Sequence, residues 1–307
     1  FLLSFSLNCL GQNTVKSPDG NILFSLKLTK ETPVYNVRFK GEVIVNDSKL
    51  SLSFKNSDDF GRDLKTQKAS FRKVDEDYEL IVGKSSKVRN HYNEMIVTLM
   101  ETSGINRTVN LTVRVFNDGI GFRYEFPEQG EWKFYSMTNE NTTFNLAQNP
   151  NVYTLFRGNY NTSHEGLYSI LPYDQIKNDT LLDMPTLFEF PEKVYMAITE
   201  ANLRNYAGMY LIKKDGVLKS QLSPLQGQQE IKVKADLPHK TPWRVMLIAD
   251  KIGTLIESNI ITSLNEPTKM GDTSWIRPGK TTFHWWNGDI LPDTTIVPGV
   301  NFETNKY

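Results

Sequence analysis

The chain has 307 residues, of which 39% are hydrophobic, and its 35 basic residues balance its 35 acidic ones. This length allows one large domain or two ordinary ones, and the apolar content is enough for a buried core. A formal net charge of zero, without any basic run interleaved with aromatic residues, argues against a nucleic-acid partner.

The N-terminal residues 1–11, FLLSFSLNCLG, form an apolar run that is too short to span a bilayer. The small residues Cys9 and Gly11 are spaced as at a signal-peptidase site, so we interpret residues 1–11 as the remnant of an export signal peptide. An apolar first strand and a lipid anchor on Cys9 are the alternatives. Because Cys9 is the only cysteine, a disulfide framework and a thiolate metal site are excluded. No membrane span is expected.

Residues 13–247 have the pattern of an all-β domain. The clearest strand is 107–116, in which valine and leucine alternate with polar residues, and Asn117-Asp118-Gly119 then turns the chain into an apolar run at 120–126. Further strands are predicted at 22–28, 34–39, 42–45, 194–200, 207–213, 230–235 and 243–249. So many strands at short intervals predict a large sandwich of two antiparallel sheets.

Two other segments complete this domain. Residues 137–183 are irregular and rich in Asn, Thr and Tyr, which predicts a long loop excursion that packs against a partner domain. One helix is predicted over 251–264, where isoleucine and leucine recur at three- and four-residue spacings before Pro267. We therefore place the β domain at 12–264 and a linker at 265–280.

The C-terminal part reads as the beginning of a second domain. Residues 281–286, TTFHWW, are predicted to be a short strand between the Pro278-Gly279 turn and Asn-Gly-Asp. Bulky rings on both faces favour a strand that is covered on both sides, as in a parallel α/β sheet or barrel. Residues 300–307 then resemble the first two turns of a helix. This pattern predicts a truncated barrel at 281–307.

Glu200 is the first candidate site residue. It follows Val194, Met196 and Ile198 on one face of its predicted strand, so its carboxylate is directed to where apolar side chains are buried. A carboxylate placed in this way must reach water, a cation or a hydrogen-bond donor. A strand end that opens into solvent and a ligand for a hard cation both fit that placement.

The other candidates are substrate contacts. Glu165, in the loop sequence NTSHEGLY, is predicted to contact a sugar or the partner domain, unless it is an ordinary surface carboxylate. Trp285, Trp286 and Asn287 combine rings with a group that binds hydroxyls, which is typical of sugar sites, although rings in a buried strand also occur as plain core. The four histidines lack zinc-protease spacing, and no serine nucleophile elbow, phosphate loop or dinucleotide fingerprint is present.

Several ordered motifs together closely resemble glycoside hydrolase family 97, over about residues 13–307. They are SPDG at 17–20, VRVFNDGIGFRY at 113–124, ITEA at 198–201, YAGMYL at 206–211 and DTSWIRPGK at 272–280. The resemblance implies a mainly β chain: a large antiparallel, galactose-mutarotase-like β-super-sandwich followed by the first βα elements of a catalytic (β/α)8 barrel. It also implies an exported bacterial protein, periplasmic or secreted.

The resemblance further implies an exo-acting α-glycosidase, either an inverting α-glucosidase or a retaining α-galactosidase, with an oligosaccharide or α-glycoside as substrate. Family members use an active-site calcium ion with a glutamate from the N-terminal domain, which matches Thr199-Glu200 here. The family's catalytic carboxylates fall beyond residue 307, so no catalytic residue is assigned in this chain, and it is expected to be inactive alone and to pack on its own barrel. The alternative is a non-catalytic carbohydrate-binding or scaffolding β-sandwich.

Overall fold

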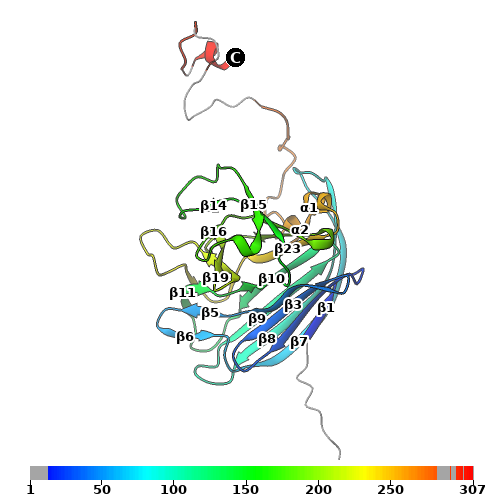
Figure 1. The fold of residues 1–307 in the computed structure, drawn as a ribbon, viewed down its shortest axis with the longest axis vertical. Coiled ribbons are helices and arrows are strands. Elements are labelled where there is room, and N and C mark those ends of the chain that lie inside the picture. The colour runs from blue at the N-terminus through cyan, green and yellow to red at the C-terminus, as the bar shows by residue number, and fades with distance from the viewer. Residues whose placement is uncertain (1–12, 282–290, 292–294, 300, 307) are drawn as a thin grey trace, which may run out of the picture. The chain divides into compact units, whose positions relative to one another are not determined.

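The computed structural model describes residues 13–281, 291, 295–299 and 301–306 (Figure 1). The predicted signal remnant lies outside these residues, and so does the predicted strand at 281–286 from residue 282 onward. Within the described part, a large compact unit holds residues 13–78 and 87–267, and a small one holds 79–86 and the residues after 267. No helix in the described part is long and apolar enough to cross a bilayer.

The large unit contains one broad sheet of ten strands, whose described pairings are antiparallel. Its order along the sheet is β15 (Ser169–Pro172), β13 (Asn151–Thr154), β17 (Thr186–Phe190), β18 (Val194–Ala201), β23 (Trp243–Ala249), β10 (Gly119–Phe126), β9 (Thr108–Phe116), β8 (Lys87–Glu101) and β7 (Leu64–Glu79), with β22 (His239–Lys240) paired to β10. The predicted hairpin around Asn117-Asp118-Gly119 is confirmed as β9 and β10.

Three smaller sheets provide the second layer. They consist of β1 (Asn13–Lys16), β2 (Ile22–Leu28), β3 (Pro33–Phe39) and β4 (Glu42–Lys49); of β21 (Val233–Asp236), β11 (Phe134–Glu140), β5 (Leu52–Phe54) and β6 (Ser57–Phe60); and of β12 (Thr143–Phe144), β20 (Val217–Leu222), β19 (Met209–Lys214), β16 (Leu181–Leu182) and β14 (Phe156–Arg157). Two short 3-10 helices, η1 (Tyr173–Gln175) and η2 (Pro191–Lys193), connect strands.

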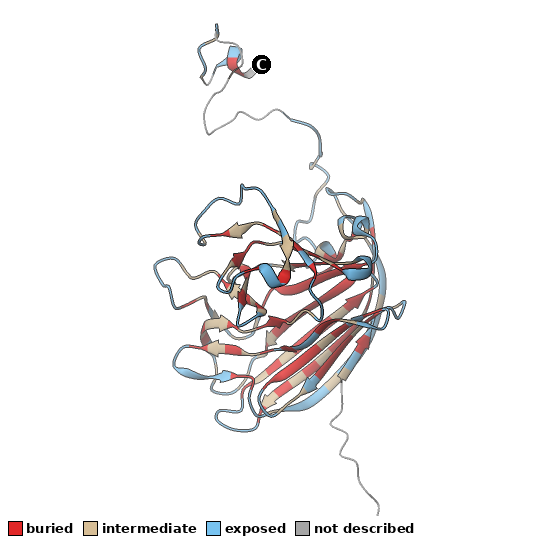
Figure 2. Ribbon diagram, viewed as in Figure 1, coloured by how far each residue is buried: buried red, intermediate tan, exposed pale blue. Residues whose placement is uncertain are grey.

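A single apolar core lies between these layers (Figure 2). Tyr35 on β3 contacts Phe122 on β10 across it, with ring centroids 5.3 Å apart. A second cluster covers the outer face of the broad sheet, where Trp243 and Leu247 of β23 pack with Ile260. The predicted antiparallel sandwich is therefore confirmed, but its second layer is divided into three sheets.

The single helix predicted over 251–264 is wrong, because two short helices occupy this segment. They are α1 (Ile252–Glu257) and α2 (Ile260–Ser263). Ser258 between them has an extended backbone, with φ −55° and ψ 133°, and its hydroxyl accepts the Ile260 N–H at 3.3 Å. A serine that binds the backbone of its neighbours competes with helical hydrogen bonding, so the spacing of apolar residues alone was misleading.

Two further differences concern strands. The region 137–183 is not one long loop, since it contains several short strands, and its main irregular segment is 158–168. The long strands β7 and β8 had no counterpart among the predicted strands. Most residues of β7 are exposed at the edge of the sheet, so its sequence lacks an apolar alternation that would reveal it. At the C-terminus, α3 (Phe302–Lys306) agrees with the helix predicted over 300–307.

A glycine is required where the β9–β10 turn meets β23. A Cβ atom at Gly119 would overlap the carbonyl oxygen of Met246, which is backbone and cannot move aside. We expect Gly119→Ala to lower the free energy of unfolding by about 1–3 kcal/mol. Urea denaturation measures this loss, and Gly130→Ala is the control because nothing lies within 4 Å of its added Cβ. Equal stability of the two variants would contradict the interpretation.

Candidate functional site

Glu200 lies where its strand pattern predicts. Met196 and Ile198 of β18 belong to the main core, and Glu200 continues the same face near the end of the strand. Its side chain is only 14% exposed, so the alternative of a strand end that opens into solvent is wrong. The adjacent strand provides a hydrogen-bond donor, which contacts the Glu200 carboxylate.

That donor is Arg244, which is the register partner of Glu200 on β23. Its Nη1 donates to Glu200 Oε2 at 2.7 Å, and the backbone N–H of Met209 on β19 donates to Oε1 at 3.1 Å. The arrangement follows from alternation, because Arg244 shares its face of β23 with Met246 and Ile248, which are core residues. Glu200 is therefore fixed at both carboxylate oxygens.

A second carboxylate, Glu140 at the end of β11, holds the same arginine from the opposite layer. Arg244 Nε and Nη2 donate to Glu140 Oε1 and Oε2 at 2.8 and 2.7 Å, and both side chains are 0% exposed. The hydroxyls of Thr142 and Tyr206 donate to the same two oxygens at 3.1 and 3.0 Å. Sequence reasoning missed Glu140, because no spacing relates it to an arginine 104 positions away.

The cluster of Glu140, Arg244 and Glu200 carries one positive and two negative charges when all three are ionised. Burial raises the pKa of Glu200 above its ordinary value, and Arg244 together with the Met209 N–H only partly opposes this. Burial alone would lower the pKa of Arg244, but the Glu140 carboxylate raises it above the ordinary value. The arginine therefore stays charged, and when both carboxylates are ionised the cluster carries one more negative charge than positive.

The residues present fit a cation beside Glu200. A carboxylate has about four lone-pair sites, and each Glu200 oxygen uses one for the hydrogen bonds described, so one site remains on each oxygen. Calcium accepts such carboxylates and needs six to eight oxygen ligands in total. No group of three or more His, Cys, Asp or Glu in the described part of the chain could hold a metal ion. Glu200 by itself offers one carboxylate with a coordination site on each oxygen.

Aromatic residues beside this cluster also line a cavity of about 710 Å³. Tyr206 and His239 line it, with ring centroids 6.1 Å apart and an interplanar angle of 18°. His239 Nδ1 is 2.7 Å from the hydroxyl of Tyr135. Burial lowers the pKa of His239, so the ring stays neutral to lower pH than an exposed histidine would.

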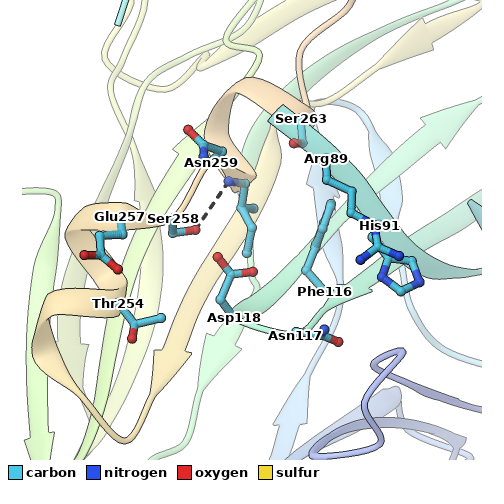
Figure 3. A pocket seen from close by; sticks show the side chains of 11 residues that line it. Arg89, His91, Phe116, Asn117, Asp118, Thr254, Glu257, Ser258, Asn259 and Ser263 are labelled. Atoms are coloured by element: carbon cyan, nitrogen blue, oxygen red, sulfur yellow. Dashed lines mark hydrogen bonds between the residues drawn. The ribbon is translucent and has the colours of Figure 1, made fainter. Parts of the chain in front are cut away.

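The remaining predicted residues are placed as follows. Glu165 is exposed in the 158–168 loop. Trp285, Trp286 and Asn287 lie outside the described residues. A separate cavity of about 270 Å³, shown in Figure 3, lies between the β9–β10 turn and the junction of α1 and α2, and none of the predicted site residues lines it.

Comparison with known families identifies a match over most of the large unit. Residues 15–267 match the sequence model described as Glycosyl-hydrolase 97 N-terminal. This range includes Glu140, Glu200 and Arg244.

Two curated relatives that match the chain are described as a retaining and a probable retaining alpha-galactosidase. A retaining alpha-galactosidase of Bacteroides thetaiotaomicron is 29% identical over 331 aligned positions, which cover 99% of this chain and 49% of the relative. A probable retaining alpha-galactosidase of Streptomyces bingchenggensis is 27% identical and covers 81% of this chain and 36% of its own length. The chain thus spans half or less of the curated relatives that it matches.

Solved structures agree with these matches. A glycoside hydrolase family 97 enzyme from Pseudoalteromonas sp. strain K8, in complex with acarbose, superposes with a TM-score of 0.82 at 31% identity. The match covers 87% of this chain and 40% of that one. A variant of an enzyme from the same strain has been solved with panose. A beta-arabinopyranosidase shares the fold, with a TM-score of 0.70 at 22% identity.

Removal of Arg244 should be severely destabilising. We expect Arg244→Met to lower the free energy of unfolding by about 3–5 kcal/mol, because two buried carboxylates would then lack their cation. Lys55→Met is the control: it breaks the ion pair with Glu230, whose side chains are 43% and 63% exposed, and should cost less than about 1 kcal/mol. Chemical denaturation of both variants checks the difference, and similar losses would argue against a decisive role for the buried cluster.

Burial of neutral His239 should make stability depend on pH. A lowered folded-state pKa means that the unfolded chain binds the proton more readily, so this stabilisation is present above about pH 6.5 and is lost as the pH falls. We expect the free energy of unfolding to fall less from about pH 7.5 to about pH 5.5 in His239→Gln than in the wild type. The difference should be at most about 1.4 kcal/mol for each pH unit. An identical pH profile would contradict this assignment.

Proposed function

Because the chain belongs to glycoside hydrolase family 97, whose N-terminal region it contains, we propose that it is part of an exo-acting, calcium-dependent α-glycosidase. The substrate class is a terminal α-linked galactoside or glucoside. The descriptions of the curated relatives support the galactoside, and the complexes of the solved relatives with acarbose and panose support an oligosaccharide ligand.

The observation that carries the calcium proposal is the unequal sharing of Arg244. Glu140 receives two of the arginine's donors and two hydroxyls, which occupy its acceptor sites, whereas Glu200 receives one arginine donor and one backbone N–H. Glu200 therefore keeps a free coordination site on each oxygen, and when both carboxylates are ionised the cluster carries one more negative charge than positive. A divalent cation supplies the missing positive charge.

The described residues would hold and orient the cation's ligand. Arg244 and the Met209 N–H fix the plane of the Glu200 carboxylate, and Glu140 fixes Arg244. When bound, calcium would act as a Lewis acid that stabilises negative charge near the sugar. The proton transfers of a two-carboxylate glycosidase mechanism belong to groups outside this chain.

The other parts of the proposal rest on the family resemblance. Glu165, Trp285, Trp286 and Asn287 are proposed sugar contacts. A catalytic (β/α)8 barrel is proposed to follow and to pack on the β-sandwich. A periplasmic or secreted location is proposed from the apolar segment at 1–11.

The calcium proposal makes a direct prediction about Glu200. We expect the full-length protein to hydrolyse aryl α-galactosides or α-glucosides, to lose this activity on chelation, and to regain it with calcium. Glu200→Gln should weaken calcium binding by at least about tenfold, because an anionic ligand becomes neutral. Isothermal titration calorimetry measures the affinity.

Glu192→Gln is the matched control, because Glu192 is an exposed carboxylate just before the same strand. It should leave calcium affinity unchanged. Equal affinity of Glu200→Gln and the wild type would remove Glu200 from the metal site, and full activity after complete removal of calcium would refute calcium dependence.

A further inference from the structure

The irregular loop at 158–168 is held from inside by two buried charged residues. Arg157 on β14, with a side chain 2% exposed, donates to the carbonyl oxygens of Thr162 and Ser163. The carboxylate of Asp183, 9% exposed, lies 2.6 Å from His164 Nδ1. A surface loop fixed in this way has already lost conformational entropy before any ligand binds, which favours tight binding.

The contact with Asp183 holds His164 at the surface of the loop. Its side chain is 60% exposed, and its ring stacks on Tyr210, with centroids 6.1 Å apart and an interplanar angle of 20°. Tyr160 packs edge-on against the same Tyr210 ring, with centroids 5.4 Å apart and an interplanar angle of 71°. Three rings from the loop and β19 therefore form one aromatic cluster.

The polar atoms of this cluster are complementary to hydroxyl groups. Because the Asp183 carboxylate accepts, a neutral His164 donates through Nδ1 and keeps Nε2 as an acceptor. In that tautomer the Tyr210 hydroxyl donates to Nε2 at 3.5 Å, which is a long hydrogen bond. Burial raises the pKa of Tyr210, so this hydroxyl remains protonated and can both donate and accept. The Tyr210 oxygen keeps its lone pairs for a sugar hydroxyl, and a sugar hydroxyl that displaces this long bond can donate to Nε2.

Strand β19 links the cluster to the proposed metal ligand. Tyr210 directly follows Met209, whose backbone N–H binds Glu200. Glu200 would hold the cation beside the reacting terminal sugar, so Tyr210 lies one residue along β19 from a backbone contact of that site.

We propose that His164 and Tyr210, held by Asp183 and Arg157, form a binding site for the leaving-group sugar of an α-linked oligosaccharide. This inference rests on the proposed α-glycosidase function. Aromatic rings bordered by hydrogen-bonding groups are how proteins bind the apolar faces and hydroxyl rims of sugars. His164 contributes little to the fold, because it is mostly exposed and the Arg157 contacts already fix the loop backbone.

The test compares two substrates of the full-length enzyme that share the same terminal sugar. One is an α-linked trisaccharide, which has a leaving-group sugar, and the other is an aryl α-glycoside, which lacks hydroxyls there. For His164→Ala we expect kcat/KM to fall about tenfold for the trisaccharide and less than about twofold for the aryl glycoside, mostly through KM. Tyr210→Phe, which removes only a hydroxyl, should also lower kcat/KM for the trisaccharide more than for the aryl glycoside.

His91→Ala is the control, since His91 is a partly exposed histidine on β8 near Asp75 and should change neither substrate. Equal losses on both substrates, or no loss on either, would overturn the proposed sugar site while the glycosidase function stands. A wild-type enzyme that hydrolyses neither substrate would instead refute the proposed function, and the sugar site with it. A thermal unfolding midpoint for Tyr210→Phe near that of the wild type excludes misfolding as the cause.

Discussion

The buried ion pair between Arg244 and Glu140 is the interaction on which the arrangement of the site depends. It joins β23 in the broad sheet to β11 in one of the smaller sheets, and neither side chain is exposed. Desolvation of two charges is costly, and a buried pair is tolerated only when its remaining hydrogen-bonding groups are satisfied. Glu140 meets that condition through Thr142 and Tyr206. The pair therefore fixes the separation of the two layers and the position of the guanidinium group.

The position of Arg244 determines in turn what Glu200 can do. One arginine faces two carboxylates: its Nε and Nη2 donate to Glu140, whereas Glu200 receives a single hydrogen bond from it, through Nη1. The asymmetry explains why the carboxylate on the strand end, and not the more deeply buried one, is the candidate ligand.

The sequence predicted those features that depend on residues close to one another in the chain. Alternation over 107–126 predicted the β9–β10 hairpin, and alternation over 194–200 predicted the core-facing direction of Glu200. The partner of Glu200 was not predictable, because Arg244 meets it only through the register of two strands that are distant in sequence. Glu140 required knowledge of which sheets face each other. The edge strand β7 was missed since exposure on both faces removes the periodic signal.

Arg157 and Asp183 fix the shape of the 158–168 loop without contacting the side chains at its tip. Arg157 and Asp183 hold it through backbone carbonyls and one imidazole, whereas Glu165, Leu167 and Tyr168 are exposed and take no part in those contacts. Replacement of these three side chains therefore leaves the anchoring intact. The tip is consequently a position at which side chains can be exchanged, by mutation or by directed evolution, without repacking the interior.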